Sequence, residues 1–239
     1  MSEQSSLTVR VVGAGRAGRS LAAALGELRW SVELSGRDSD VSGAADGVEL
    51  LVLAVPDGAI AEVAASVEPV ASTVVAHLAG SLGLEVLAPH RLRAAIHPLV
   101  ALPNAEVGAE RLRGGAWFAV AGEPIAADVV AALGGRSFTV DDRDRVAYHA
   151  AAVIASNHLV ALLDQVEAVA PDGVPFDAYL DLVRSTVDNV AALGPVAALT
   201  GPAARGDTAT IERHLAALAP EERALYEVLA ARCARMAGR

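Results

Sequence analysis

The sequence predicts an α/β protein in which a doubly wound parallel sheet is followed by an all-helical C-terminal region. Three observations lead to this prediction. Short strand-like runs alternate with helical patterns in the first part of the chain, and a glycine-rich turn follows the first of those runs. From Arg143 onward the apolar residues keep a helical spacing only. We therefore expect two domains, over residues 1–142 and 143–239.

The expected strands and helices alternate up to the predicted boundary. The strands cover 8–12, 31–35, 48–55, 73–77, 94–96, 116–120 and 137–140. The helices between them cover 20–28, 58–67, 84–87 and 125–133. Pro56 and Asp57 end the third strand and open the helix that follows it. Beyond the boundary, helical patterns cover 143–169, 176–193, 208–218 and 221–236, which predicts a domain without strands.

The glycine-rich turn has the pattern G-x-G-x-x-G, in Gly13, Gly15 and Gly18. After a strand, the first glycine permits a tight turn, the second lets the main chain approach a pyrophosphate, and the third lets the helix pack closely on the sheet. The helix start then attracts phosphates through its free N–H groups. This predicts a dinucleotide-binding Rossmann domain; the alternative is a structural loop in a chain that contains 21 glycines. The predicted cofactor-binding residues are Gly13, Gly15, Arg16, Ala17, Gly18, Ser35, Arg37, Val55, Pro56 and Asp57.

The end of the second strand favours NADP over NAD. An NAD site usually places an acidic residue there for the ribose 2′-hydroxyl, whereas this chain reads Ser35-Gly36-Arg37-Asp38. A serine hydroxyl and an arginine fork suit a 2′-phosphate. The alternative is that Arg37 is a solvated loop residue and that Asp38 binds the hydroxyl of NAD.

Composition excludes several classes of function. The net charge of −10 argues against binding to nucleic acid or to anionic membranes, since both are polyanions. Lysine is absent, so Schiff-base chemistry has no amine, and no His/Cys cluster predicts a metal. The single Cys233 cannot form an intramolecular disulfide, the N-terminus lacks a signal-peptide pattern, and charges interrupt the alanine-rich stretches. We expect a cytoplasmic protein with a small-molecule substrate.

The chain resembles the 6-phosphogluconate-dehydrogenase-like superfamily, and within it the proteins that join a Rossmann-like domain to a DUF2520 domain. The resemblance lies in residues 12–18, 53–57, 77–81, 96–99, 148–157 and 199–207. Relatives of known activity include ketopantoate reductases, pyrroline-5-carboxylate reductases and 3-hydroxyisobutyrate dehydrogenases. The resemblance implies a reductase of a small C=O or C=N substrate, and a homodimer that pairs through the helical domain.

Candidate catalytic residues follow the strands at the edge where a ligand would lie. In an open α/β sheet that edge is formed by the carboxyl ends of the strands, where Ser81 and His97 are expected. His97 is the leading candidate for the proton donor, since the ordinary pKa of histidine near 6.5 permits the role. The alternatives are that His97 only ends a strand beside Pro98, and that Ser81 only caps a helix.

Two polar residues on the apolar helix after the boundary are further candidates. Asn157 is predicted to be catalytic and Ser156 to contact substrate, because a cleft would explain polar groups on this helix. In the hydroxyacid dehydrogenases that the chain resembles, a lysine lies about one turn before such an asparagine, but Ile154 stands at that position here. A keto-acid reductase would therefore have to use His97 or His149 with Asn157.

A polar segment at 200–207 is the last candidate. Thr200 and Arg205 are predicted to contact substrate, with the arginine as a clamp for a carboxylate. The alternative is an interhelix turn in which Asp207 caps the next helix. Three functions remain open: reduction of a small 2-keto acid with ketopantoate as the specific substrate, reduction of a cyclic imine of the pyrroline-5-carboxylate type, and a non-catalytic NADP-binding sensor.

Overall fold

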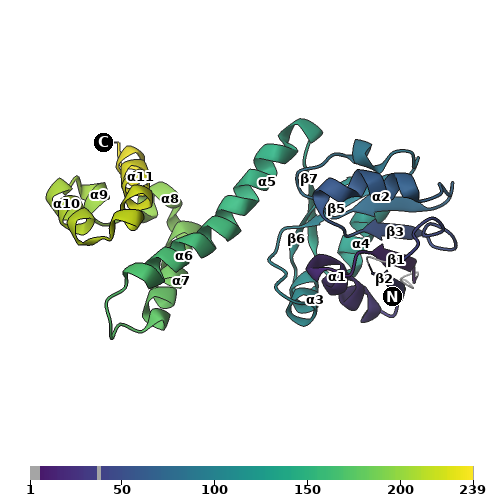
Figure 1. Ribbon diagram of the computed structural model, residues 1–239, viewed down its shortest axis with the longest axis horizontal. Helices are drawn as coiled ribbons and strands as arrows, with labels where there is room; N and C mark the ends of the chain where they lie inside the picture. The colour runs from purple at the N-terminus through teal and green to yellow at the C-terminus, as the bar shows by residue number, and fades with distance from the viewer. Residues whose placement is uncertain (1–5, 37–38, 239) are drawn as a thin grey trace. The chain divides into compact units, whose positions relative to one another are not determined.

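The computed structural model describes residues 6–36 and 39–238, which divide into two compact units. The first unit covers Met1–Ser156 and the second Asn157–Arg239. Figure 1 shows the first as a sheet covered by helices and the second as helices alone. The predicted fold class, an α/β domain followed by a helical region, is therefore confirmed.

The first unit is built on a seven-stranded sheet with the strand order β2-β1-β3-β4-β5-β6-β7. The strands are β1 (Thr8–Val12), β2 (Ser31–Ser35), β3 (Leu50–Leu53), β4 (Val74–His77), β5 (Arg93–Pro98), β6 (Trp117–Gly122) and β7 (Arg136–Thr139). The helices are α1 (Arg16–Gly26), α2 (Ile60–Ser66), α3 (Ala105–Arg113), α4 (Ile125–Ala132) and α5 (Arg145–Val153), with 3-10 turns at η1 (Asp57–Ala59), η2 (Leu84–Leu87) and η3 (Asp142–Asp144).

The sheet is parallel from β2 to β5, but β6 pairs antiparallel with β5, and β7 is parallel to β6. The wholly parallel sheet expected from the alternating pattern is corrected at this point. Between β5 and β6 lies α3, a helix that the sequence pattern did not predict because it is rich in charge. Its start is capped by Asn104, whose Oδ1 accepts from the N–H of Val107 at 2.9 Å.

The central strands are buried on both faces. In β1, Val9 and Val11 lie on one face and Val12 on the other; in β3, Leu50 and Val52 alternate with Leu51 and Leu53 in the same way. This continuous apolar sequence is typical of parallel strands covered by helices on both sides. Apolar packing on both faces holds the strands in place, and so it also positions the residues that follow their carboxyl ends.

The first unit extends past residue 142, the predicted boundary, because side chains of α5 contact β5 and the loop that follows β4. A π-helical turn, η4 (Ile154–His158), follows α5, and α6 (Leu159–Val169) continues from it. The π-helical turn includes Ser156 and Asn157. The compact units therefore meet inside the helical stretch predicted over 143–169.

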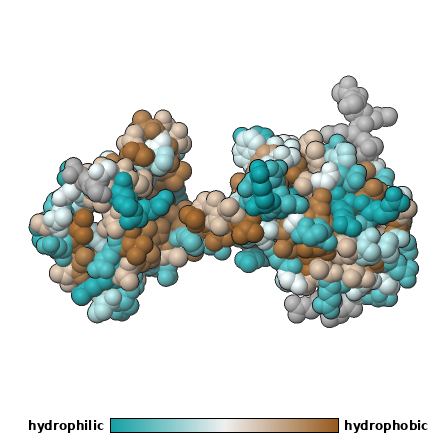
Figure 2. Space-filling model, turned by 90° about the horizontal axis from the view of Figure 1, so that it is seen from above, coloured by the Kyte–Doolittle hydropathy of each residue, from teal (hydrophilic) through white to brown (hydrophobic). Residues whose placement is uncertain are grey.

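The second unit consists of α6 and five further helices. These are α7 (Phe176–Leu193), α8 (Pro195–Ala198), α9 (Pro202–Arg205), α10 (Thr208–Ala217) and α11 (Pro220–Met236). Over 157–238, the described part of this unit, no residue is buried. Figure 2 shows apolar residues, in brown, at its surface on the left. Large apolar side chains are among them: Val187 is 55% exposed and Leu193 61%.

One helical stretch within the described residues, Asp142–Val169, is long and apolar enough by length and composition to cross a membrane. None of its most apolar window is buried. Charged residues were predicted to interrupt such stretches, but in Asp142–Val169 they are too sparse to do so.

Candidate functional site

The turn between β1 and α1 has the geometry that its glycines predict. Gly13 has φ +114°, and a Cβ there would lie 2.4 Å from the carbonyl oxygen of Ala54. A Cβ on Gly18 would lie 1.9 Å from the carbonyl oxygen of Gly13. Neither position can therefore hold a larger residue without moving the main chain, and the turn is packed tightly against β3.

Gly15 differs from its two neighbours in the motif. It is exposed, and a Cβ there would meet nothing within 4 Å. No side chain caps α1, which begins at the exposed Arg16. A helix start of this kind, with open space before it, suits a phosphate group. The residues present therefore fit the pyrophosphate of a dinucleotide, with Ala17 and Gly18 in the first turn of the helix.

The neighbouring strand ends form the rest of the predicted cofactor site. Ser35 ends β2 and is half-buried, and its carbonyl oxygen accepts from the N–H of Gly13 at 3.0 Å. Arg37 lies outside the described residues. Val55, half-buried, follows β3, and the exposed Pro56 and Asp57 come after it. These residues share one edge of the sheet with Gly15.

Asp57 links two strand ends. Its Oδ2 accepts a hydrogen bond from the hydroxyl of Ser81 at 3.3 Å. Ser81 follows β4, where it was predicted at the ligand edge. The structure thus gives the Ser81 hydroxyl a carboxylate partner at this edge.

The carboxyl end of β5 carries a cluster of aromatic and imidazole rings. Nδ1 of His97 lies 2.7 Å from the hydroxyl of Tyr148, and the two rings meet edge to face with centroids 5.5 Å apart. The ring of His149 lies 5.8 Å from that of His97. A Cβ on Gly80 would lie 2.7 Å from Cδ2 of His149 and 2.9 Å from Nε2 of His97. Gly80 therefore leaves the room that both histidines occupy.

Burial controls the protonation of this cluster. The pKa of His97 is lowered to about 4, mainly by desolvation and to a smaller extent by His149 and Arg145, while Asp57 opposes them. Desolvation also raises the pKa of Tyr148, against a smaller opposite effect of Arg145. At neutral pH the imidazole of His97 is therefore neutral and the phenol of Tyr148 is protonated. These protonation states favour Tyr148 over His97 as the proton donor.

His77, at the end of β4, has a structural environment. Its Nδ1 accepts from the N–H of Ala79 at 3.2 Å, so Nε2 carries the proton and donates to the carbonyl of Gly83 at 3.2 Å. Desolvation is the main cause that lowers its pKa. His77 is thus a neutral core residue that holds the loop after β4.

The remaining predicted residues lie in the π-helical turn and the helical unit. The Ser156 hydroxyl donates to the carbonyl of Ala152 at 2.8 Å. Asn157 begins the second unit. Thr200 lines a cavity of that unit, and Arg205 is exposed at the end of α9. Asp207 accepts from the N–H of Thr210 at 3.0 Å, which is the helix cap that the alternative interpretation of this segment described.

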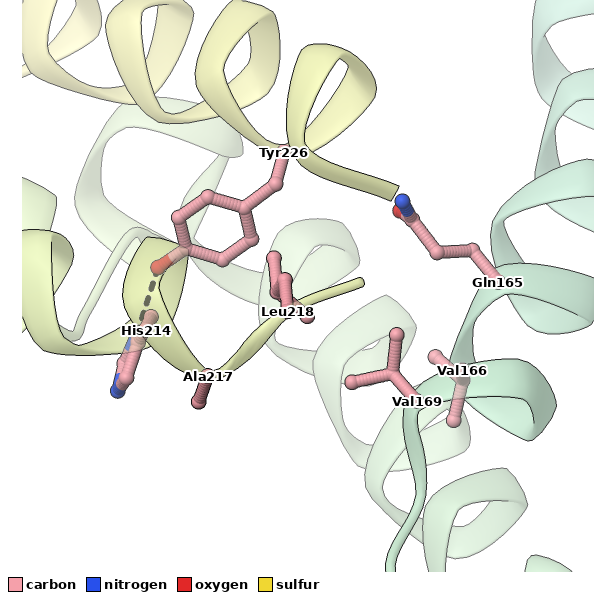
Figure 3. Close-up of a pocket in the computed structure, with 7 residues that line it drawn as sticks. All are labelled: Gln165, Val166, Val169, His214, Ala217, Leu218 and Tyr226. Atoms are coloured by element: carbon pink, nitrogen blue, oxygen red, sulfur yellow. Dashed lines mark hydrogen bonds between the residues drawn. The ribbon is translucent and has the colours of Figure 1, made fainter. Parts of the chain in front are cut away.

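Two cavities lie in the helical unit. One, of about 330 Å³, is lined by α6, α10 and α11, as Figure 3 shows. Its lining is apolar apart from Gln165 and a pair in which Nδ1 of His214 lies 2.6 Å from the hydroxyl of Tyr226. The second, of about 290 Å³, shares Gln165 and Tyr226 with the first and includes Thr200. Both are exposed grooves, and none of the described residues over 157–238 is buried.

Sequence reasoning missed Tyr148 and Arg145 as site residues. Tyr148 pairs with His97, and Arg145 is a fully buried charge that faces the same cluster. Helical spacing carried a usable signal, because Arg145 and Tyr148, and likewise Arg145 and His149, are three and four residues apart and so share a face. Their contact with β5, about fifty residues earlier, had no sequence signal.

Comparison with known proteins agrees with this two-part organisation. Residues 35–103 match the model of the Rossmann-like domain, and residues 119–233 match that of a domain of unknown function, DUF2520. The chain is therefore a Rossmann-like plus DUF2520 protein, as the sequence resemblance predicted. No curated protein matches it.

Solved structures share the fold over nearly the whole chain. A provisionally named NADP oxidoreductase from Bacteroides fragilis is 22% identical, with a TM-score of 0.77 over 96% of this chain and 98% of that one. A reductive aminase from Aspergillus terreus, solved with NADPH, is 14% identical, with a TM-score of 0.73 over 97% and 94%. A 1-pyrroline-5-carboxylate reductase from Streptococcus pyogenes is 15% identical, with a TM-score of 0.64 over 96% and 99%.

Proposed function

We propose that this protein is an NADP-dependent oxidoreductase that reduces a small C=O or C=N substrate. The observation that carries the proposal is that Gly15 and the His97–Tyr148 pair lie at the same edge of one sheet. The strands β1, β3, β4 and β5 are parallel neighbours, so the ends of β1 and β5 are about 14 Å apart. An extended dinucleotide lying across the strand ends suits such a span. The fold shared with NADP-dependent reductases supports the same choice.

The chain's own groups supply the proton of the reaction. With NADPH held at the turn between β1 and α1, the hydride for the substrate carbon would come from its nicotinamide. Tyr148 gives its hydroxyl proton to the substrate oxygen or nitrogen. His97, in the tautomer with its proton on Nδ1, then donates a hydrogen bond to the phenolate oxygen. A neutral imidazole can do this without first taking up a proton from solvent.

The substrate class has two candidates. The first is a small 2-keto acid, with ketopantoate as the specific proposal. The second is a cyclic imine, which the likeness to a pyrroline-5-carboxylate reductase and to a reductive aminase favours. A protonated imine already carries its proton and so does not need a strong acid, which suits a site whose tyrosine has a raised pKa.

Turnover assays separate these candidates from a non-catalytic sensor. Purified protein with NADPH is offered ketopantoate, other 2-keto acids and a panel of cyclic imines, and cofactor oxidation is followed by absorbance. Turnover on either set supports a reductase and selects its class. Tight NADPH binding without turnover on any member would instead assign the protein as a sensor, and absence of binding would refute both.

Arg37 tests the choice of cofactor. If its guanidinium binds the 2′-phosphate, Arg37→Ala weakens NADPH binding much more than NADH binding. Equal weakening would remove the preference for NADP. Titration of both reduced cofactors by fluorescence measures the two dissociation constants directly.

We propose, in addition, that the chain pairs with a second copy through the helical unit. No residue is buried over 157–238, so this unit has no core of its own among the described residues. The exposed apolar side chains of this unit need a binding partner that is always present. A second copy of the chain is always present, whereas an occasional partner is not. The negative charge of the chain also disfavours an anionic lipid surface.

A further inference from the structure

Arg145 is an almost fully buried charge that is only partly paired. Its side chain is 1% exposed, and its Nε donates to Oδ1 of Asp142 at 2.9 Å. Within the described part of the chain, its other two nitrogens, Nη1 and Nη2, are buried without a hydrogen-bond partner. The carboxylate of Asp142 is 66% exposed, so it faces solvent more than it faces the guanidinium.

A buried guanidinium with two unpaired nitrogens costs folding free energy, and the geometry of the group indicates which hydrogen-bond acceptor would pair with them. Arginine cannot lose its proton in a protein, so burial does not neutralise it. The planar Nη pair is suited to two parallel hydrogen bonds to a carboxylate or a phosphate. Nε already holds Asp142, which leaves the Nη edge for a second anion.

The position of Arg145 on α5 places its guanidinium near the proposed active site. Arg145 lies one turn before Tyr148 and His149 on the same face of α5, and both of those side chains contact the end of β5 or its neighbour Gly80. The charge of Arg145 acts on the titration of His97 and of Tyr148, which places it in the same cluster.

We propose that Arg145 binds the carboxylate of the substrate, so that the enzyme acts on 2-keto or 2-imino acids rather than on neutral ketones and imines. This inference rests on the proposed function, since it uses the same cluster. The carboxylate takes the Nη edge, and the adjacent C=O or C=N lies toward the hydroxyl of Tyr148, one helical turn away. In this proposal Arg145 has the role of carboxylate clamp that was predicted for Arg205, whose own contact with substrate stays a prediction.

The competing explanation is that Arg145 only holds α5 on the sheet through Asp142. A matched pair of ligands separates the two: 2-oxoisovalerate, which carries the carboxylate, and its methyl ester, which does not. Binding of each to the NADP⁺-loaded protein is measured by calorimetry, and turnover of each with NADPH is measured alongside. Calorimetry does not need turnover, so the test survives a failure of the reductase proposal.

We expect the wild-type protein to bind the acid more tightly than the ester. In Arg145→Gln, the dissociation constant and the KM for the acid should rise roughly 10- to 100-fold, the range for a lost charged hydrogen bond, while the values for the ester change little. Arg145→Lys should recover part of the preference for the acid, because it restores the charge without the fork.

Asp142→Asn is the control for the structural explanation. It removes the ion pair and leaves the guanidinium, so acid binding should persist in it. The proposal is overturned if Arg145→Gln weakens acid and ester equally, if Asp142→Asn reproduces its effect, or if the wild-type protein binds both ligands alike. Thermal unfolding of each variant identifies any that fails to fold, and Arg145→Lys then carries the test.

Discussion

The hydroxyl of Tyr148 lies 2.7 Å from Nδ1 of His97, although the two residues are 51 positions apart in the chain. One comes from the last helix of the first unit and the other from the end of β5. Because His97 is neutral and Tyr148 is protonated at neutral pH, the pair can release a proton only from the phenol.

Removal of that phenol should therefore abolish most of the turnover. Tyr148→Phe keeps the ring contact with His97 and removes the proton, so kcat should fall about 10²- to 10⁴-fold with little change in NADPH affinity. Tyr226→Phe is a matched control, because Tyr226 makes a similar pair with His214 in the helical unit. Stopped-flow measurement of NADPH oxidation checks both. An undiminished kcat in Tyr148→Phe would assign the donor elsewhere.

The pH dependence of turnover should follow the same assignment. With the pKa of His97 at about 4 and that of Tyr148 above its usual value, kcat/KM should stay level between about pH 6 and 8. A protonated His97 acting as the acid would instead make activity decline steadily above about pH 4. A pH profile on a substrate that does not itself titrate in this range distinguishes the two.

Folding stability should depend on pH through His97. Its pKa is lower in the folded protein than the usual 6.5, so the unfolded chain binds the proton more readily. The contribution of neutral His97 to the free energy of unfolding is therefore fully present above pH 6.5 and is lost as the pH falls toward 4. Between pH 7 and 5 the loss is about 1–2 kcal/mol. Urea unfolding at both values measures it, and His97→Gln should show a smaller loss than the wild-type protein.

Substitution by alanine should have different effects at two glycines of the turn between β1 and α1. Gly15→Ala places a methyl group in open space, so the protein should fold normally but bind NADPH less tightly, because the methyl occupies room that the pyrophosphate needs. Gly18→Ala places its Cβ 1.9 Å from the carbonyl of Gly13, so it should lower the melting temperature. Calorimetry with NADPH and thermal unfolding check the pair. Unchanged NADPH affinity in Gly15→Ala would refute the cofactor site.

Light scattering tests the pairing of the helical unit. We expect the mass of two chains for the wild-type protein. Val187→Glu with Leu193→Glu, on the exposed apolar surface of α7, should yield single chains or unstable protein. A single chain in the wild-type protein would refute the proposal, and partition of the wild-type protein into detergent would favour the membrane helix that the composition of Asp142–Val169 also permits.

The parts of this protein that could be predicted from its sequence are those that depend on neighbouring residues. The turn at Gly13 to Gly18 could be predicted because the requirements of a strand, a tight turn and a helix start all fall within a few positions. The buried strands could be predicted from their continuous apolar runs. The cap at Asp207 could be weighed for the same local reason, since its partner Thr210 is three residues away.

Features that depend on contacts between distant parts of the chain could not be predicted in this way and became visible in the folded protein. β6 runs antiparallel to β5, and the helix between them, α3, carries too much charge for an apolar pattern to reveal it. The pairing of Tyr148 with His97 requires α5 to pack on the end of β5, and no local pattern specifies which helix covers which strand. The protonation of His97 and the burial of Arg145 follow from that packing, because a pKa responds to the surroundings that the fold creates.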